Sequence, residues 1–410
     1  MNENAIVARL AQLAEIGKHA GGIDRALATP QERRARELFA KWARDGGYAL
    51  TQDAAGNLFA RRAGARTDAA PILVGSHLDT VPTGGAYDGA YGVAGAMCAL
   101  ELLDRRGITL QHPVEAVAWA GEEGSRFPMG CLGSSAFTGL WRLEDVLALS
   151  ASDGVMLRDA LNSAAGGLLP DVPARDAQRT AAYLELHVEQ GPVLEREGVP
   201  LGVVTAIAGQ RRYSITIEGE SGHAGTVPMQ LRNDPLGAAA EVVLAIESSA
   251  RDAGETVATI GRFTVEPGGT NVIPARVIFS LDVRSPHDDR VSMVEEAAHR
   301  ALETAQRQRR VQGSMECLEA RPPAPMDERM RAAVHRAIAG MNERAIDIPS
   351  GAGHDAMCLA RIAPAAMIFV PSIGGRSHVG AERTADADLE RGVEALAAAI
   401  VEVDATLDEN

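Results

Sequence analysis

Short strand-like apolar runs that end in polar residues recur along the chain, separated by stretches with helical spacing. The runs occupy residues 71–76, 114–119, 183–189 and 366–370. Helical spacing is found, among other places, at residues 4–16, 31–45 and 92–106. Strands that alternate with helices predict an α/β fold, here a mostly parallel mixed sheet flanked by helices. Such sheets bind ligands at the carboxyl ends of their strands, so the polar residues after each run are candidates for a functional site.

Residues 211–320 carry a different pattern. Strands are expected at residues 213–218, 257–265, 276–284 and 314–320, and helices at residues 233–252 and 288–309. The order β-α-β-β-α-β predicts a ferredoxin-like α+β unit, and the α/β pattern resumes after it. We therefore expect a larger domain formed by residues 1–209 and 324–410, interrupted by an inserted smaller domain formed by residues 210–323.

The composition is that of an acidic globular protein. Of the 410 residues, 40 are Lys or Arg and 55 are Asp or Glu, which gives a net charge of −15. Such a chain repels phosphate backbones and anionic lipids, so nucleic acid and membrane surfaces are excluded as partners. The N-terminal residues lack the apolar block of an export signal, and the four cysteines form no C-x-x-C pair. We therefore expect a cytoplasmic protein with reduced, mostly buried thiols.

The acidic residues Asp79 and Asp88 follow the first run closely. His77 and Asp79 lie two positions apart, so in a strand their side chains point to the same face. The Asp79 carboxylate can then accept the second imidazole N–H of a metal-bound His77. Asp88 lies in a glycine-rich loop, from which its carboxylate can be aimed at a ligand. The alternative for both acids is a role in stabilising turns.

The second run leads into the adjacent acids Glu122 and Glu123. Two carboxylates at a buried strand end repel each other unless a cation neutralises one of them. If Glu123 binds a metal ion, Glu122 is free to act as a general base beside it. His187 lies in the third run and His378 follows the fourth, which makes both further candidate ligands.

Five candidate ligands are more than one metal ion with an open coordination position requires. They are His77, Asp88, Glu123, His187 and His378. This number suits two metal ions that share one bridging carboxylate, as in two-metal hydrolases. Donor sets of histidine and carboxylate without thiolate suit zinc or manganese. The sequence contains no H-E-x-x-H, G-x-S-x-G or G-x-x-x-x-G-K-[ST] motif, so the corresponding chemistries lack support.

These motifs together resemble those of the aminoacylase and carboxypeptidase-type dinuclear metallohydrolases. The resemblance is closest to the hydantoinase/carbamoylase branch, which contains N-carbamoyl-L-amino-acid amidohydrolases, β-ureidopropionases and allantoate amidohydrolases. The matching segments are residues 75–81, 84–89, 121–124, 186–192, 222–229, 271–274, 350–357 and 377–378. They extend over most of the chain.

The resemblance implies two divalent metal ions per subunit, zinc or manganese, with cobalt or nickel as replacements in vitro. It assigns His77, Asp88 and His187 to one ion, and Asp88 with Glu123 and His378 to the other. It also implies that Asp79 orients His77 and that Glu122 is the general base.

The resemblance further implies a set of substrate contacts. Arg284 would bind the substrate carboxylate, and the other contacts would be Gln210, His223, Asn271, Gly375 and Ser377. In relatives, the position of His223 reaches across a dimer interface, so the inserted domain is expected to act as a lid and to form a homodimer. Arg376 departs from the small or apolar residue of many relatives, which leaves the identity of the substrate open.

The expected activity is hydrolysis of the ureido C–N bond of an N-carbamoyl-L-amino acid to the amino acid, ammonia and carbon dioxide. The alternatives are an allantoate amidohydrolase, another ureido-acid hydrolase such as a β-ureidopropionase, or a non-catalytic binding protein on the same fold. Taken alone, His223 could be a turn residue and Arg284 a surface base on an edge strand. His354 and Asp355 are expected to support the site without binding metal. The histidines expected to be exposed are His19, His112, His287, His299 and His335.

Overall fold

A computed structural model of the chain describes residues 5–163 and 176–408. The chain folds into two compact units. The larger unit consists of Met1–Thr205 and Pro325–Asn410, and the smaller unit is Ala206–Ala324. Each unit has its own hydrophobic core. The polar N-terminus, residues 1–4, lies outside the described residues.

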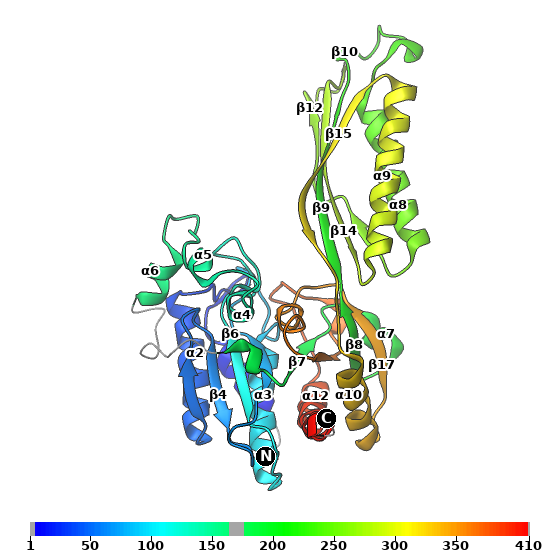
Figure 1. The fold of residues 1–410 in the computed structure, drawn as a ribbon. Helices are drawn as coiled ribbons and strands as arrows, with labels where there is room; N and C mark the ends of the chain where they lie inside the picture. The colour runs from blue at the N-terminus through cyan, green and yellow to red at the C-terminus, as the bar shows by residue number, and fades with distance from the viewer. Residues whose placement is uncertain (1–4, 164–175, 409–410) are drawn as a thin grey trace. The chain divides into compact units, whose positions relative to one another are not determined.

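The larger unit is built on a nine-stranded mixed sheet (Figure 1). Its four central strands run parallel, in the order β18 (Ala365–Val370), β7 (Ala182–Val188), β5 (Ile72–His77) and β6 (Val114–Trp119). The flanking strands are β4 (Leu58–Arg62), β3 (Ala49–Gln52), β8 (Leu201–Ile207), β16 (Ala324–Pro325) and β17 (Ala345–Ser350). Beside the parallel centre, β4 runs antiparallel to β6 and β8 antiparallel to β18. The predicted α/β fold with a mixed sheet is confirmed.

The four central strands are buried along their whole length, as is usual for parallel strands covered by helices. The largest core contains side chains from these strands and from five helices. These are α1 (Ala5–Ala14), α2 (Pro30–Asp45), α3 (Ala90–Arg105), α10 (Glu328–Gly340) and α12 (Asp386–Asp408). Further elements are α4 (Leu132–Thr138), α5 (Leu143–Leu147), α6 (Leu157–Asn162), α7 (Val193–Glu197), α11 (Ala356–Leu359), β1 (Lys18–His19), β2 (Gly22–Ile23) and two 3-10 turns, Ala177–Arg179 and Ile373–Gly375.

The smaller unit has the ferredoxin-like arrangement predicted from the order of its elements. Its antiparallel sheet has the order β11 (Val257–Thr259), β14 (Arg276–Ser285), β9 (Gly209–Glu218) and β15 (Gln312–Arg321). Buried residues alternate with more exposed ones along β9 and β14, and helices α8 (Pro235–Ala253) and α9 (Asp288–Arg309) complete the core. Further elements are β10 (Gly222–His223), β13 (Val272–Ile273) and the 3-10 turn Met229–Leu231.

One strand of the smaller unit differs from the prediction. Residues 257–265 form two short strands, β11 and β12 (Phe263–Glu266), and both pair with β14. The break covers residues 260–262 and contains Gly261, and the main-chain N–H of Arg262 donates to the side chain of Ser280. Glycine weakens a strand because it has no side chain to pack, so the interruption follows from this residue.

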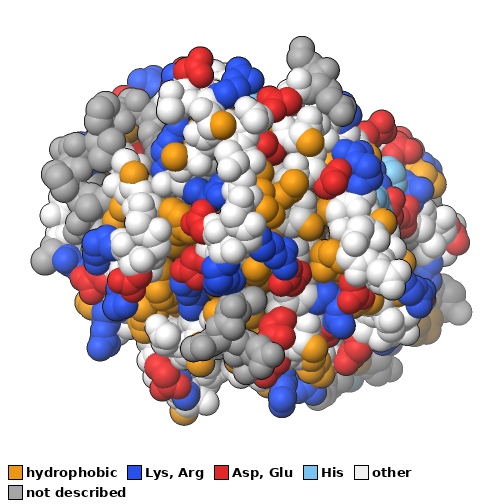
Figure 2. Space-filling view, turned by 90° about the horizontal axis from the view of Figure 1, so that it is seen from below, with side chains coloured by type: hydrophobic (Ala, Val, Ile, Leu, Met, Phe, Trp, Pro, Cys, Tyr) orange, Lys and Arg blue, Asp and Glu red, His pale blue; other side chains and the backbone are white. Residues whose placement is uncertain are grey.

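Charged side chains of both signs are interspersed over the face in Figure 2, with apolar side chains in separate areas between them. This distribution is that of an ordinary hydrated surface. Among the described helices, none is both long enough and apolar enough to cross a membrane.

Candidate metal centre

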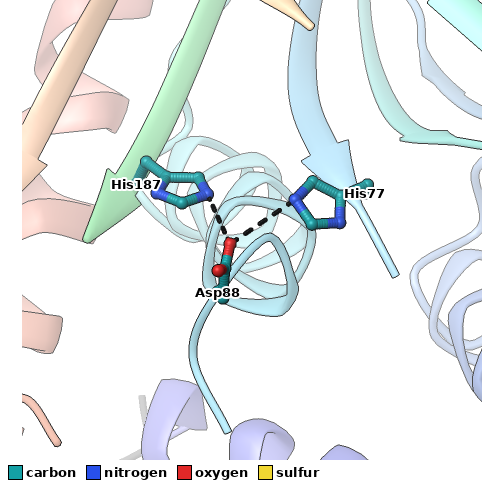
Figure 3. Close-up of side chains that lie close together, drawn as sticks. All are labelled: His77, Asp88 and His187. Atoms are coloured by element: carbon teal, nitrogen blue, oxygen red, sulfur yellow. Dashed lines mark ion pairs between the residues drawn. The ribbon is translucent and has the colours of Figure 1, made fainter. Parts of the chain in front are cut away.

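The five candidate ligands lie together at the carboxyl ends of the central parallel strands of the larger unit. His77 is the last residue of β5, and His187 is close to the end of β7. Glu123 follows β6, and His378 follows β18. Asp88 lies in the loop before α3, with its carboxylate between the imidazoles of His77 and His187 (Figure 3). The topology therefore brings together residues up to 301 positions apart.

The Asp88 carboxylate faces two groups of ligands at once. Its Oδ1 lies 3.3 Å from Nε2 of His187 and 3.6 Å from Nε2 of His77. Its Oδ2 lies 3.2 Å from Nε2 of His378, which is itself 3.6 Å from Oε2 of Glu123. Two potential metal-binding groups result, His77 with Asp88 and His187, and Asp88 with Glu123 and His378. Asp88 is in the position of a bridging carboxylate.

Main-chain hydrogen bonds orient the two buried histidines. Nδ1 of His77 lies 3.0 Å from the main-chain oxygen of Asp79, and Nδ1 of His187 lies 2.8 Å from that of Val188. Since a carbonyl oxygen only accepts, each Nδ1 carries the hydrogen. The lone pair of each neutral imidazole is then on Nε2, the atom that faces Asp88.

Asp79 contacts His77, as expected, but mainly through its backbone. Its main-chain oxygen, rather than its carboxylate, makes the hydrogen bond to His77, and Oδ1 is 3.7 Å from Nδ1. The carboxylate instead accepts the main-chain N–H groups of Glu122 and Glu123, each at 3.1 Å. Asp79 thus orients His77 through its backbone and the glutamate pair through its side chain. Residue spacing alone could not distinguish these two uses.

Glu122 lies beside the ligands, with Oε2 3.7 Å from Nε2 of His77. Burial raises its pKa, and the charges of Asp79 and Asp88 add to this effect against the opposing charge of His77. Its Oε1 accepts a hydrogen bond of 3.3 Å from the thiol of Cys131, a residue that the sequence had not marked as functional. The Cys131 contact leaves Oε2 as the oxygen that faces the ligands.

The electrostatics of the pocket fit divalent cations. Burial, followed by the negative charge of Asp88, raises the pKa of Glu123 to about 8. The hydrogen bond to Asp88 is the main cause that raises the pKa of His378 to about 9. Several carboxylates thus share a buried space with too little positive charge, a situation that bound cations relieve. The donor set of imidazole and carboxylate, with no thiolate within either group, suits zinc or manganese.

His354 and Asp355 lie behind the ligands, where a supporting role was expected. The ring of His354 meets that of His187 edge-on, with centroids 4.5 Å apart, and its Nε2 lies 2.8 Å from the hydroxyl of Ser350. Burial lowers the pKa of His354 well below its ordinary value. The grouping of Glu185 with His187 and His354 could also hold a cation by distance alone. The Glu185 carboxylate, however, already accepts hydrogen bonds from Ser76, Tyr183 and the main chain of Ala356.

The loop after β18 places Ser377 beside Asp88. The Ser377 hydroxyl lies 3.1 Å from Oδ2 of Asp88, and Nε2 of Gln190 lies 2.8 Å from the same oxygen. Gln190 was missed in the sequence, although it follows His187 in a segment that carries the family resemblance. Gly375 has a φ of 62°, and a Cβ there would lie 2.8 Å from the main-chain nitrogen of Pro192, so the loop requires glycine.

The four expected substrate contacts of the smaller unit fall into two pairs. Gln210 and Arg284 are directly opposite each other on β9 and β14, and both bind Asp282. His223 and Asn271 lie together at the β10–β13 pairing. The first pair lies at the start of β9 and the second follows its far end, and β9 spans roughly 30 Å at about 3.3 Å per residue. Since β14 has neighbours on both sides, the edge-strand alternative for Arg284 is wrong.

Of the remaining histidines, His19, His287 and His299 are exposed as expected, and His335 is half-buried. His112 is buried, contrary to the expectation. Its Nδ1 lies 2.9 Å from a carboxylate oxygen of Asp404, which also accepts its main-chain N–H. This partner is 292 residues away in the chain, so no local pattern could reveal it.

Comparisons with known proteins agree with this geometry. The chain matches the model of peptidase family M20/M25/M40 over residues 73–402. It is 42% identical over 392 residues to an N-carbamoyl-L-amino acid amidohydrolase of Geobacillus stearothermophilus, with 95% of each chain covered. It is 39% identical over 399 residues to an allantoate amidohydrolase of Bacillus subtilis, with 96% of each covered. A solved amidase of the hydantoinase/carbamoylase family from Burkholderia multivorans has a TM-score of 0.93 and 37% identity, covering 98% of this chain and 97% of that one.

Proposed function

Because the chain belongs to the hydantoinase/carbamoylase branch of peptidase family M20/M25/M40, we propose that it hydrolyses the ureido C–N bond of N-carbamoyl-L-amino acids. The products are the amino acid, ammonia and carbon dioxide. The observation that carries this proposal is the position of Asp88 between two ligand groups, with Glu122 beside them. A site of this kind in a family of metal-dependent hydrolases supports hydrolysis of a carbonyl–nitrogen bond.

Two divalent cations, one in each ligand group, would supply a more acidic water and a polarised substrate carbonyl. The chain's own residues then carry the proton. Glu122 accepts it from the attacking water at Oε2, the oxygen that faces the ligands, and passes it to the leaving nitrogen. Asp79 holds the main chain of Glu122 in place while this happens.

Arg284, the basic residue proposed to contact the substrate, supports an anionic substrate. The guanidinium of Arg284 is a planar fork that suits both oxygens of a carboxylate, and Asp282 holds it in orientation through bonds of 3.0 and 3.2 Å. His223 and Asn271 carry side-chain N–H groups suited to an oxygen that becomes negative during hydrolysis. An N-carbamoyl amino acid has both a carboxylate and a ureido carbonyl.

The separation of these residues supports a shared site in a homodimer. Gln210 lies at the start of the long strand β9 and His223 lies beyond its far end on β10, so the two are too far apart to contact one small substrate within a single chain. We infer that His223 and Asn271 act in the site of a second copy, while Gln210 and Arg284 act in their own. Free cysteines in an acidic chain support a cytoplasmic location for this dimer.

Allantoate is the second candidate substrate, because the relative from Bacillus subtilis that carries this name is almost as similar as the carbamoylase. Allantoate also has a carboxylate and ureido groups, so the same residues can bind it.

The test is release of ammonia from N-carbamoyl-L-amino acids, N-carbamoyl-β-alanine and allantoate, with the protein reloaded with manganese or zinc. We expect the highest kcat/KM for an N-carbamoyl-L-amino acid. A higher kcat/KM for allantoate would identify allantoate as the substrate in place of the N-carbamoyl-L-amino acid. Two bound metal ions per subunit without turnover of any ureido acid would favour a binding protein on the same fold.

A further inference from the structure

A buried acid that the sequence analysis had not marked joins the two loops that carry Asp88 and His378. Glu382 lies four residues after His378, between β18 and α12, and is 6% exposed. Its carboxylate points at the loop that leads into α3. Both loops belong to the larger unit, so their contact is internal to one compact body.

The Glu382 carboxylate holds Asp88 by its main chain and competes with the Asp88 carboxylate for the single hydroxyl hydrogen of Ser377, which lies between them. Oε2 accepts the main-chain N–H groups of Tyr87 at 2.8 Å and of Asp88 at 3.2 Å. Oε1 lies 3.0 Å from the hydroxyl of Ser377, which in turn lies 3.1 Å from Oδ2 of Asp88. Oδ2 is the oxygen that faces His378, so these contacts control the orientation of the shared carboxylate.

The loop sequence leaves room for this carboxylate. A Cβ on Gly85 would lie 2.0 Å from Oε2 of Glu382, so any side chain there displaces the acid. A buried acid that accepts two main-chain N–H groups of the loop, with a glycine that leaves space for it, indicates a specific task.

We propose that Glu382 is a positioning residue of the metal centre, which holds Asp88 with one oxygen toward each ligand group. The inference rests on the proposed two-metal site. A residue with a purely structural role would lower the stability of the fold when lost and would leave metal affinity unchanged. Loss of the Glu382 carboxylate weakens metal binding as well.

Three variants test the geometry. Glu382→Ala removes all three contacts and is expected to weaken binding of manganese or zinc about 10- to 100-fold, the usual effect of losing a residue that orients metal ligands. Glu382→Gln keeps all three contacts, because its oxygen can accept both N–H groups while its NH₂ donates to Ser377, which leaves the hydroxyl hydrogen of Ser377 for Asp88. Its affinity is expected to stay within about threefold of the wild type. Gly85→Ala displaces the carboxylate without removing it and is expected to resemble Glu382→Ala.

Asp404 supplies a matched control far from the ligands in the sequence. It is also 6% exposed and also accepts two successive main-chain N–H groups, those of Gln111 and His112, each at 2.8 Å. Asp404→Ala is expected to lower the melting temperature at least as much as Glu382→Ala and to leave metal affinity unchanged.

The readouts are metal affinity by titration calorimetry, the absorption spectrum of the cobalt-loaded protein and the melting temperature, all without substrate. Glu382→Ala and Gly85→Ala are expected to alter the cobalt spectrum, and Glu382→Gln to leave it unaltered. Unchanged affinity in a folded Glu382→Ala, or an equal loss in Asp404→Ala, overturns the inference. If Glu382→Ala does not fold, Gly85→Ala decides the question. A wild-type metal affinity of Gly85→Ala overturns the inference, and a weakened metal affinity supports it. A wild-type protein that binds no metal instead refutes the proposed function itself.

Discussion

Glu122 is held on three sides by different groups. Its main-chain N–H donates to Asp79, its Oε1 accepts the thiol of Cys131, and its Oε2 faces His77. The contact with Asp79 fixes the main chain of Glu122, and the contact with Cys131 holds Oε1 of its side chain. Oε2 is then the oxygen available for proton transfer. A residue held in this way is expected to act in the chemical step and to contribute little to the binding of metal or substrate.

Glu122→Gln tests this role because the amide has the same shape but cannot accept the proton. We expect kcat to fall by about 100-fold or more, with the metal content of the purified protein unchanged. The measurements are steady-state kinetics and elemental analysis on the same preparation. Activity close to that of the wild type would show that another group is the base.

Cys131 has a φ of 51°, a left-handed conformation that is unfavourable for residues other than glycine. Cys131→Gly relieves this conformation and Cys131→Ala does not, so the glycine variant is expected to be more stable by about 1 kcal/mol. Both variants lose the thiol that holds Glu122, and both are expected to have a lower kcat than Cys131→Ser. Urea unfolding and kinetics on the three variants check these orders. If kcat of the three variants has the same order as their free energies of unfolding, the thiol has no role in catalysis beyond its effect on stability.

At the scale of whole elements, burial explains which strands the sequence predicts. The central strands β5, β6, β7 and β18 are continuous apolar runs because both faces are covered, and they were predicted to within a few residues. The short edge strand β3 has exposed and half-buried residues, and four residues are too few for a periodic pattern. Antiparallel edges of this kind are recognised only once their partner strand is known.

Asp282 on β14 makes the stability of the smaller unit depend on pH. Burial opposes the effect, but hydrogen bonds from Arg284, Arg212 and Gln210 lower the pKa of Asp282 below its ordinary value of 3.8. A lowered carboxyl pKa contributes stability that is complete above the unfolded value and is lost as the pH falls through the folded value.

Asp282→Asn removes this contribution. We expect it to lower stability at pH 7 by up to about 1 kcal/mol, since the pair is partly exposed. The difference from the wild type should shrink below about pH 4. Urea midpoints measured across this pH range check the expectation. A difference that stays constant down to pH 3 would contradict the role of the Asp282 charge.

The site shows how far residue types and spacing can predict a metal centre. The five candidate ligands were singled out because they follow buried strands, and parallel strands bring such positions together. The contacts of Cys131, Gln190 and Glu382 were not predicted, because each depends on the direction in which a loop points. For the same reason, the side chain of Asp79 was matched to His77 when it in fact holds the glutamates.

At the scale of the whole molecule, the proposed dimeric site makes a prediction about mixtures of inactive variants. His223→Ala and Arg284→Ala each remove one contact from every site of a homodimer. If the two residues come from different subunits, a mixed dimer has one complete site. Refolding the two variants together should then restore about a quarter of wild-type activity, since half of the dimers are mixed and each has one working site of two.

The control is each variant refolded alone, which should remain inactive. Mixed dimers can be isolated with two different affinity tags, so that their presence is verified before the assay. Verified mixed dimers without activity would place His223 in the same site as Arg284, or outside the site altogether.

The chain enters and leaves the smaller unit through neighbouring residues. Gln210 at the start of β9 is opposite Arg321 at the end of β15, and on the side of the larger unit the N–H of Met326 donates to the carbonyl of Thr205. Because the two ends of the folded insertion are adjacent, closing the chain of the larger unit around it costs about as much conformational entropy as closing a short surface turn. This cost does not depend on the length of the insertion. Evolution can exchange or reshape the inserted segment, and with it the residues proposed to recognise the substrate, while the candidate ligands on the larger unit stay as they are.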